Sequence, residues 1–161
     1  MIDENIIPVN YISQPDEQTC WYASYKMMLD YQSMGAWNAR ADHLPNMSLM
    51  RERGILDSEL APCRNHLGLS STTYKSFLTA GGVADAIDRY GPVWCSGFWA
   101  EGHKHIVVLC GVREGYISAP EVYVNDPRRA LHGAASKGTW WSFEKFVKNL
   151  NKVPYAFQHW A

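Results

Sequence analysis

The stretch that decides the fold reads Gln14-Pro-Asp-Glu-Gln-Thr-Cys20-Trp21-Tyr-Ala-Ser-Tyr-Lys-Met-Met-Leu29. Its second half predicts an amphipathic helix over residues 20–34, because apolar side chains recur there mostly at steps of three and four. Asp16 or Thr19 is positioned to cap this helix, and Gly35 to end it. The chain therefore places a cysteine at the first turn of a helix with one buried face.

Cys20 is the candidate nucleophile. The first turn of a helix has unpaired backbone N–H groups and the positive end of the helix dipole, and both favour a thiolate over a thiol. Gln14 lies six residues upstream in a polar turn, where its amide can donate to an oxygen on the carbon that the sulfur attacks. Gln18 is a competing donor, but only two residues from Cys20 it has little room to fold back.

Length and composition narrow the function classes. The chain has 161 residues, which fits one domain over 1–161 with a sizeable core. It has 15 basic and 16 acidic residues, and no basic stripe that would indicate a nucleic-acid or membrane partner. The four cysteines have no zinc-ligand spacing, so neither a metal nor a cofactor is expected. The acidic N-terminus lacks the pattern of a signal peptide, which favours a cytoplasmic location.

The remaining segments divide into a helical first half and a strand-rich second half. An extended lead-in and loops are expected at 1–13, 36–46 and 54–70. Further helices are expected at 47–53, 73–80, 83–90 and 142–150. Strands are expected at 92–99, 104–112, 121–125, 139–141 and 155–160, the first two as an antiparallel pair. This order predicts an α+β fold, with a helical half packed against a small antiparallel sheet.

Two further residues are candidates for the same site. His105 opens an apolar, β-branched run, and a strand can hold an imidazole still for proton transfer; His103 is the alternative. Asp126 follows a strand expected beside it and is predicted to accept the imidazole Nδ1–H. Asn125 is the neighbouring alternative, and Asn125-Asp126-Pro127 is also a good turn sequence.

Taken together, these motifs resemble the papain-like cysteine peptidase superfamily. They are Gln14-x5-Cys20-Trp21, His105 opening a strand that ends at Gly111, and a strand that ends at Asp126-Pro127. The small bacterial branches are the most similar, namely the leader peptidases of bacteriocin precursors and the papain-like peptidases delivered as effectors or toxins. The resemblance spans roughly residues 8–150.

The resemblance implies a catalytic triad. Cys20 is the nucleophile, His105 the general base and acid, and Asp126 the orienting residue, at a position where papain has an asparagine. Gln14 and the backbone N–H of Cys20 form the oxyanion hole. Trp21, Trp99 and Trp141 either line a substrate groove or belong to the core.

Three functions remain open from the sequence. The first is a protease that acts on a protein substrate. The second uses the same thiol chemistry on another amide, as a deamidase, a transglutaminase-like enzyme or a peptidoglycan amidohydrolase. The third, a binding domain without catalysis, is disfavoured by the intact set of Gln, Cys, His and Asp.

Restraint of a protease is expected to come from outside this stretch of chain. No segment is long enough for an inhibitory propeptide, so a separate inhibitor or immunity protein, or a larger parent chain, is the expected source. The resemblance also implies delivery by a secretion system into a target cell as the alternative to a cytoplasmic location.

Overall fold

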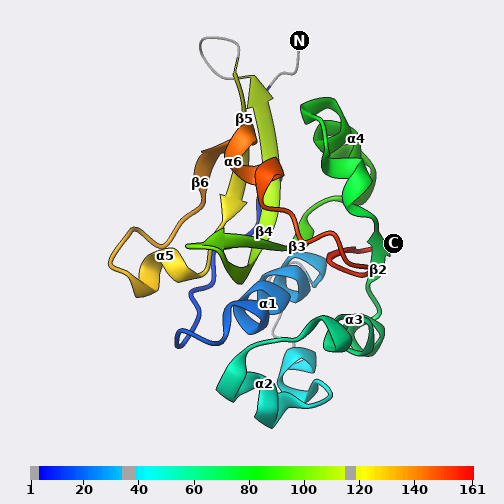
Figure 1. Ribbon diagram of the computed structural model, residues 1–161, viewed down its shortest axis with the longest axis vertical. Helices are drawn as coiled ribbons and strands as arrows, with labels where there is room; N and C mark the ends of the chain where they lie inside the picture. The colour runs from blue at the N-terminus through cyan, green and yellow to red at the C-terminus, as the bar shows by residue number, and fades with distance from the viewer. Residues whose placement is uncertain (1–3, 34–38, 115–118) are drawn as a thin grey trace.

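The computed structural model describes residues 4–33, 39–114 and 119–161 (Figure 1). The helices are α1 (Cys20–Gln32), α2 (Met47–Arg53), α3 (Leu60–Leu67), α4 (Ala80–Tyr90), α5 (Arg128–Leu131) and α6 (Phe143–Lys148). The strands are β1 (Asn5–Ile6), β2 (Ser70–Thr72), β3 (Val93–Ala100), β4 (His103–Glu114), β5 (Pro120–Asn125), β6 (Thr139–Ser142) and β7 (Phe157–His159). Short 3-10 turns lie at Arg40–His43, Asp57–Glu59 and Tyr74–Phe77.

The strands form one sheet in the order β2-β7-β3-β4-β5-β6, and β1 pairs with the far half of β4. Each described pairing is antiparallel. Strand β4 is the longest and pairs with β3 on one side and β5 on the other. With its separate helices and antiparallel strands, the structure confirms the predicted α+β papain-like fold.

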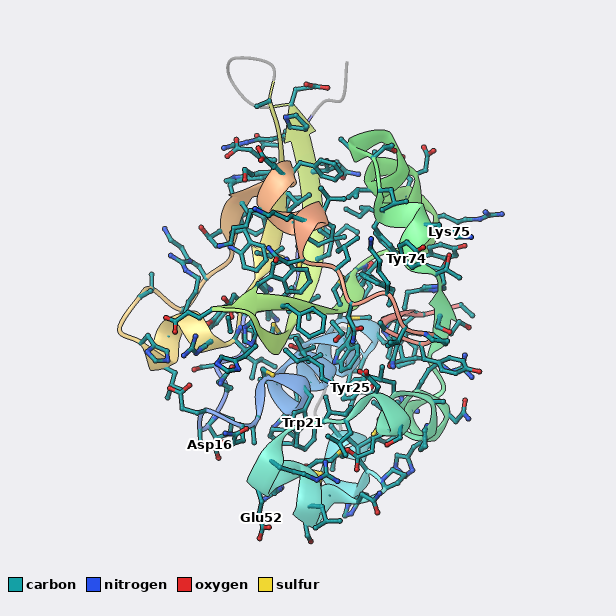
Figure 2. The ribbon with its side chains drawn as sticks, in the orientation of Figure 1. Asp16, Trp21, Tyr25, Glu52, Tyr74 and Lys75 are labelled. Atoms are coloured by element: carbon teal, nitrogen blue, oxygen red, sulfur yellow. The ribbon has the colours of Figure 1, made fainter. Side chains whose placement is uncertain are left out.

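Helix α1 joins the helical half to the sheet. Figure 1 shows α1, α2 and α3 gathered at one end of the molecule, with α1 beneath the central strands. Trp21 and Tyr25 point from α1 into the interior and are fully buried (Figure 2), and the Tyr25 ring stacks on Trp94 of β3 at 4.5 Å. The Ser24 hydroxyl donates to the carbonyl of Ile106 in β4 at 3.4 Å. These contacts hold the start of α1 against the start of β4.

Most predicted elements are confirmed because their local signals agree with their packing. The β-branched and aromatic runs become β3, β4 and β5, and the bounds of α2 are as predicted. Ser142 caps α6 by accepting from the N–H of Lys145 at 3.1 Å.

The prediction of a loop over residues 54–70 is wrong, since α3 lies within it. Pro62 argued against a helix, but it is the third helical residue, where its missing N–H has no intrahelical partner to lose. Gly68 ends α3 in the left-handed region, at φ 75°.

Other element boundaries also differ from the predictions. Helix α1 ends at Gln32, and the predicted stop at Gly35 lies outside the described residues. The helix predicted over residues 73–80 is a 3-10 turn, and α4 begins at Ala80 because the Thr79 hydroxyl accepts from the N–H of Gly82 at 2.9 Å. The lead-in forms only the two-residue strand β1. Within the described ranges, no helix is long and apolar enough to span a membrane.

Candidate active site

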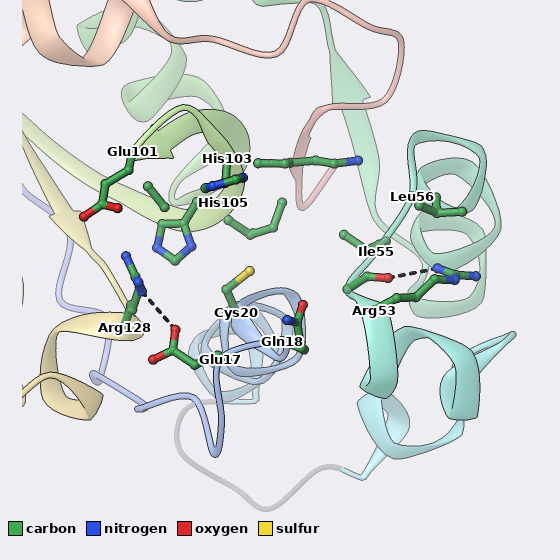
Figure 3. A pocket seen from close by; sticks show the side chains of 14 residues that line it. Glu17, Gln18, Cys20, Arg53, Ile55, Leu56, Glu101, His103, His105 and Arg128 are labelled. Carbon is green, nitrogen blue, oxygen red and sulfur yellow. Dashed lines mark hydrogen bonds and ion pairs between the residues drawn. The ribbon is translucent and has the colours of Figure 1, made fainter.

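A cavity of about 460 Å³ lies where the helical half meets the sheet (Figure 3). One wall is the segment 53–56 at the end of α2, and the other is the tip of the β3–β4 hairpin. The floor includes Cys20 and His105, and Arg128 of α5 reaches the rim. The cavity therefore brings together four parts of the chain that are far apart in sequence.

The loop before α1 presents Cys20 to this cavity. The carboxylate of Asp16 accepts from the N–H of Gln18 at 3.0 Å, and the Thr19 hydroxyl accepts from the N–H of Asp16 at 3.2 Å. Thr19 is thus the residue before the helix, but its side chain closes the loop instead of capping α1. The indole N–H of Trp21 donates to the carbonyl of Gln18 at 2.7 Å. The loop is fastened to itself, and Cys20 is left half-buried as the first residue of α1.

His105 lies next to Cys20. It is the third residue of β4, directly opposite Gly97 of β3, and only 4% of it is exposed. Its Nε2–H donates to Oδ1 of Asp126 at 2.6 Å. The prediction that Nδ1 makes this bond is wrong, because the ring edge turned toward the end of β5 carries Nε2. The other edge of the ring faces the thiol of Cys20 (Figure 3), whose hydrogen bonding and charge raise the pKa of His105.

The electrostatics of the site favour a protonated imidazole. Burial lowers the pKa of His105, but hydrogen bonds to Asp126 and Cys20, together with their charges, raise this pKa to about 9. Burial alone would raise the pKa of Asp126. Its hydrogen bond to His105 and the charge of the imidazolium outweigh burial, so the pKa of Asp126 is lowered. The site thus holds an imidazolium between two groups that are anions when deprotonated.

The structure distinguishes between the alternative residues for the second and third members of the predicted triad. His103 is exposed at the mouth of the cavity, and in the described part of the chain no hydrogen bond joins it to a carboxylate. Neighbouring residues of a strand point to opposite faces. Asn125 accordingly faces away from His105, and its amide donates to the carbonyl of Val9 at 3.0 Å. The geometry places His105 and Asp126 at the site, and His103 and Asn125 beside it.

Gln14 is not part of the cavity lining. It is buried, its Nε2 donates to the carbonyl of Asp16 at 2.7 Å, and its Oε1 has no hydrogen-bond partner among the described residues. Gln18 does line the cavity and reaches toward the opposite wall, so that a methyl group added at Gly54 would lie 3.6 Å from its Oε1.

The three predicted groove tryptophans lie outside the lining of this cavity. For Trp21 the groove alternative is wrong, because its side chain is fully buried in the core. Trp99 packs instead on α6, where its ring stacks on Phe146 and its indole N–H donates to the Phe146 carbonyl at 3.1 Å. Trp141 contacts Trp99 in the same cluster, at 5.5 Å between ring centroids. These rings fill the space between α6 and the sheet.

Several lining residues were missed because they are ordinary surface residues in the sequence. Glu17 accepts from Nε of Arg128 at 3.2 Å across the rim (Figure 3), and Lys104 pairs with Asp57 at 2.8 Å. Glu101 lies at the hairpin tip with φ 55°, a left-handed conformation uncommon outside glycine. In the sequence, these residues could have been found only by their closeness to Cys20, His105 and Asp126.

Among the described residues, no group of three or more His, Cys, Asp and Glu side chains is arranged to hold a metal ion. The other three cysteines, Cys63, Cys95 and Cys110, are buried. Of the four thiols, only that of Cys20 reaches the cavity.

Comparisons with known proteins agree with this geometry. A search of curated proteins finds no match. A family model described as papain-like cysteine protease AvrRpt2 matches residues 2–151, which is most of the chain. This family comprises papain-like peptidases that act as bacterial effectors. The chain therefore belongs to the AvrRpt2 family of papain-like cysteine proteases.

Proposed function

We propose that this chain hydrolyses peptide bonds of a protein substrate, with Cys20 as the nucleophile, His105 as the general base and acid, and Asp126 as the orienting residue. The observation that carries the proposal is a row of interacting side chains that runs from Cys20 and His105, which line the cavity, to Asp126, which does not. Cys20 at the start of α1 interacts with His105 and raises its pKa, and Nε2 of His105 is bonded to Asp126. This arrangement activates a thiol and fixes the imidazole tautomer at the same time.

The first half of the reaction forms a covalent intermediate. Nδ1 of His105 takes the proton of Cys20, and the thiolate attacks the carbonyl carbon, forming a C–S bond while the carbonyl oxygen becomes negative. The backbone N–H of Cys20 has no acceptor within the helix at this position, so it is available to this oxygen. The second donor is Gln14, whose Nε2 has one N–H left after the bond to Asp16.

The second half releases both products. The C–N bond breaks as His105 gives its proton to the leaving amine, which leaves a thioester on Cys20. His105 then takes a proton from water, whose oxygen attacks the thioester carbon. The C–S bond breaks, the carboxylic acid leaves, and the thiol regains its proton from His105.

The test uses the two histidines of the cavity as a matched pair. Wild type, Cys20→Ala, His105→Gln and His103→Gln are assayed on labelled casein, a glutamine-amide substrate and muropeptides. We expect casein cleavage by wild type and His103→Gln, and none by Cys20→Ala or His105→Gln. Cleavage by Cys20→Ala would overturn the assignment. Ammonia release or muropeptide hydrolysis without casein cleavage would move the function to the deamidase or amidohydrolase class.

The proposal extends to the place of action. As an effector, the chain acts after delivery by a secretion system into a target cell, and a separate inhibitor or immunity protein restrains it beforehand. The test is expression in a bacterial and in a eukaryotic cytosol, wild type against Cys20→Ala. Toxicity that depends on Cys20 supports an effector or toxin role in that host, and equal harmlessness in both hosts argues against it.

A further inference from the structure

The segment of residues 9–14 lies along the turn that carries Asp126. At one end, the Asn125 amide donates to the carbonyl of Val9 at 3.0 Å. At the other end, the N–H of Gln14 donates to the carbonyl of Pro127 at 3.1 Å. The N-terminal segment is therefore fastened on both sides of Asp126.

Tyr11 occupies the middle of this segment. Its hydroxyl donates to the backbone carbonyl of Asp126 at 2.5 Å and accepts from the N–H of Ala130 at 3.2 Å. One oxygen thus bridges the residue that begins the turn and a residue of α5. Burial raises the pKa of Tyr11, so the hydroxyl keeps its proton for this bond at neutral pH.

Besides Tyr11, the Asp126 carbonyl accepts from the N–H of Arg129 at 3.1 Å, a bond within the turn itself. Helix α5 is four residues long and buries none of them, so the core does not fix its position. The Asp126 carboxylate is oriented locally, by accepting from the N–H of Arg128 at 3.0 Å. That bond can aim the carboxylate at His105 only if the turn itself is correctly placed.

We propose that Tyr11 is a positioning residue of the active site, which holds the backbone of Asp126 so that its carboxylate meets Nε2 of His105. Tyr11 does not touch the reacting atoms and acts through Asp126. Its effect on turnover rests on the function proposed above, but its effect on the imidazole does not.

The decisive experiment is an NMR titration of the His105 ring in wild type, Tyr11→Phe and Tyr74→Phe. Phenylalanine keeps the ring of Tyr11 and removes only the hydroxyl. Tyr74 is the matched control, because it is also partly exposed, is not among the residues that line the cavity, and its hydroxyl makes no hydrogen bond in the described residues. We expect Tyr11→Phe to lower the pKa of His105 by roughly half a unit to one unit, and Tyr74→Phe to leave it unchanged.

A purely structural role predicts a different result. In that case Tyr11→Phe lowers the unfolding midpoint while His105 titrates as in wild type, and the proposal is overturned. On a cleaved substrate, we expect kcat to fall roughly 5- to 10-fold with KM unchanged. If no substrate is cleaved by wild type, the proposed function fails, and the NMR titration still decides the role of Tyr11.

If Tyr11→Phe does not fold, a second measurement on the wild-type protein tests the same hydrogen bond. Hydrogen exchange of the Ala130 amide in wild type reports the bond to Tyr11 directly. We expect this amide to be protected, and exchange as fast as in an unfolded peptide would rule the bridge out.

Discussion

Nε2 of His105 lies 2.6 Å from Oδ1 of Asp126, and only 5% of the His105 side chain and 16% of the Asp126 side chain are exposed. The pair is shielded from solvent, so its charges interact strongly. Because the pKa of His105 is raised to about 9, the site responds to pH on the alkaline side.

We expect peptidase activity to be lost as pH rises through about 9. The imidazolium is the proton donor to the leaving amine, and it deprotonates in that range. The measurement is kcat/KM from pH 6 to pH 10 for wild type and Asp126→Asn. The variant should be weaker, and its alkaline limb should move to lower pH. An unmoved limb would mean that Asp126 does not set the charge of His105.

The same pair makes stability depend on pH. The pKa of His105 is higher in the folded state than in the unfolded chain. Its contribution to the free energy of unfolding is therefore complete below pH 6.5 and is lost as pH rises toward 9. We expect the free energy of unfolding to fall by on the order of 3 kcal/mol across this range. Urea denaturation of wild type, His105→Gln and His66→Gln measures it. Only His105→Gln should lose this slope, since His66 is exposed.

Gln14 and Gln18 can be separated by paired alanine variants. If Gln14 donates to the oxyanion, Gln14→Ala should lower kcat by about 10²–10³ with little change in KM. Gln18→Ala removes a side chain that lines the cavity, so it should alter KM more than kcat. Steady-state kinetics on one peptide substrate, with kcat and KM compared between the two variants, shows which glutamine is the donor. A larger loss of kcat in Gln18→Ala would reassign the donor.

Iodoacetamide should modify one thiol of the native protein. Burial raises the pKa of Cys63 and Cys110 to about 12, and that of Cys95 well above its ordinary value, so these thiols stay protonated and inaccessible. Cys20 is the one thiol at the cavity. Peptide mapping after labelling at pH 6–8 should find Cys20 alone, and labelling in guanidinium should find all four. Native labelling of Cys63 would contradict the packing of α3.

Gly97 is a position where a single added methyl group should destabilise the fold. A Cβ there would lie 2.5 Å from the Trp99 ring and 2.7 Å from the carbonyl of Asn149, which already accepts from the N–H of Phe98. We expect Gly97→Ala to cost about 1–3 kcal/mol of stability. Gly81→Ala is the matched control, because a Cβ in that helical position meets nothing within 4 Å and should stabilise by about 0.5–1 kcal/mol. Thermal unfolding of both variants checks the pair.

The parts of the fold that the sequence predicted well are those in which local pattern and packing agree. The run from Ile106 to Val112 is β-branched and apolar because β4 is covered on both faces. Cys20 was identifiable since its position at a helix start is itself the chemical signal. Asp126 and His105 were placed by the expectation that neighbouring strands end near each other.

The parts that were missed depend on three-dimensional contacts. Pro62 is tolerated because of its exact place in the first turn of α3, which a composition pattern does not reveal. Trp21 follows the nucleophile in sequence, but helical rotation turns it into the core. The choice of Nε2 over Nδ1 in His105 depends on ring orientation, and the role of Tyr11 depends on a contact across more than a hundred residues.

The place of β7 in the sheet has a consequence for biosynthesis. This strand, at Phe157–His159, is inserted between β2 and β3, so both of those strands have unpaired edges until it arrives. Gln158 also accepts from the Tyr25 hydroxyl of α1 at 2.8 Å and donates to the carbonyl of Leu60 at 3.2 Å. A nascent chain on the ribosome therefore lacks the strand that locks the helix of Cys20 to the sheet of His105. The order of synthesis thus postpones the contacts of Gln158 with α1 and α3 until residue 158 has been translated.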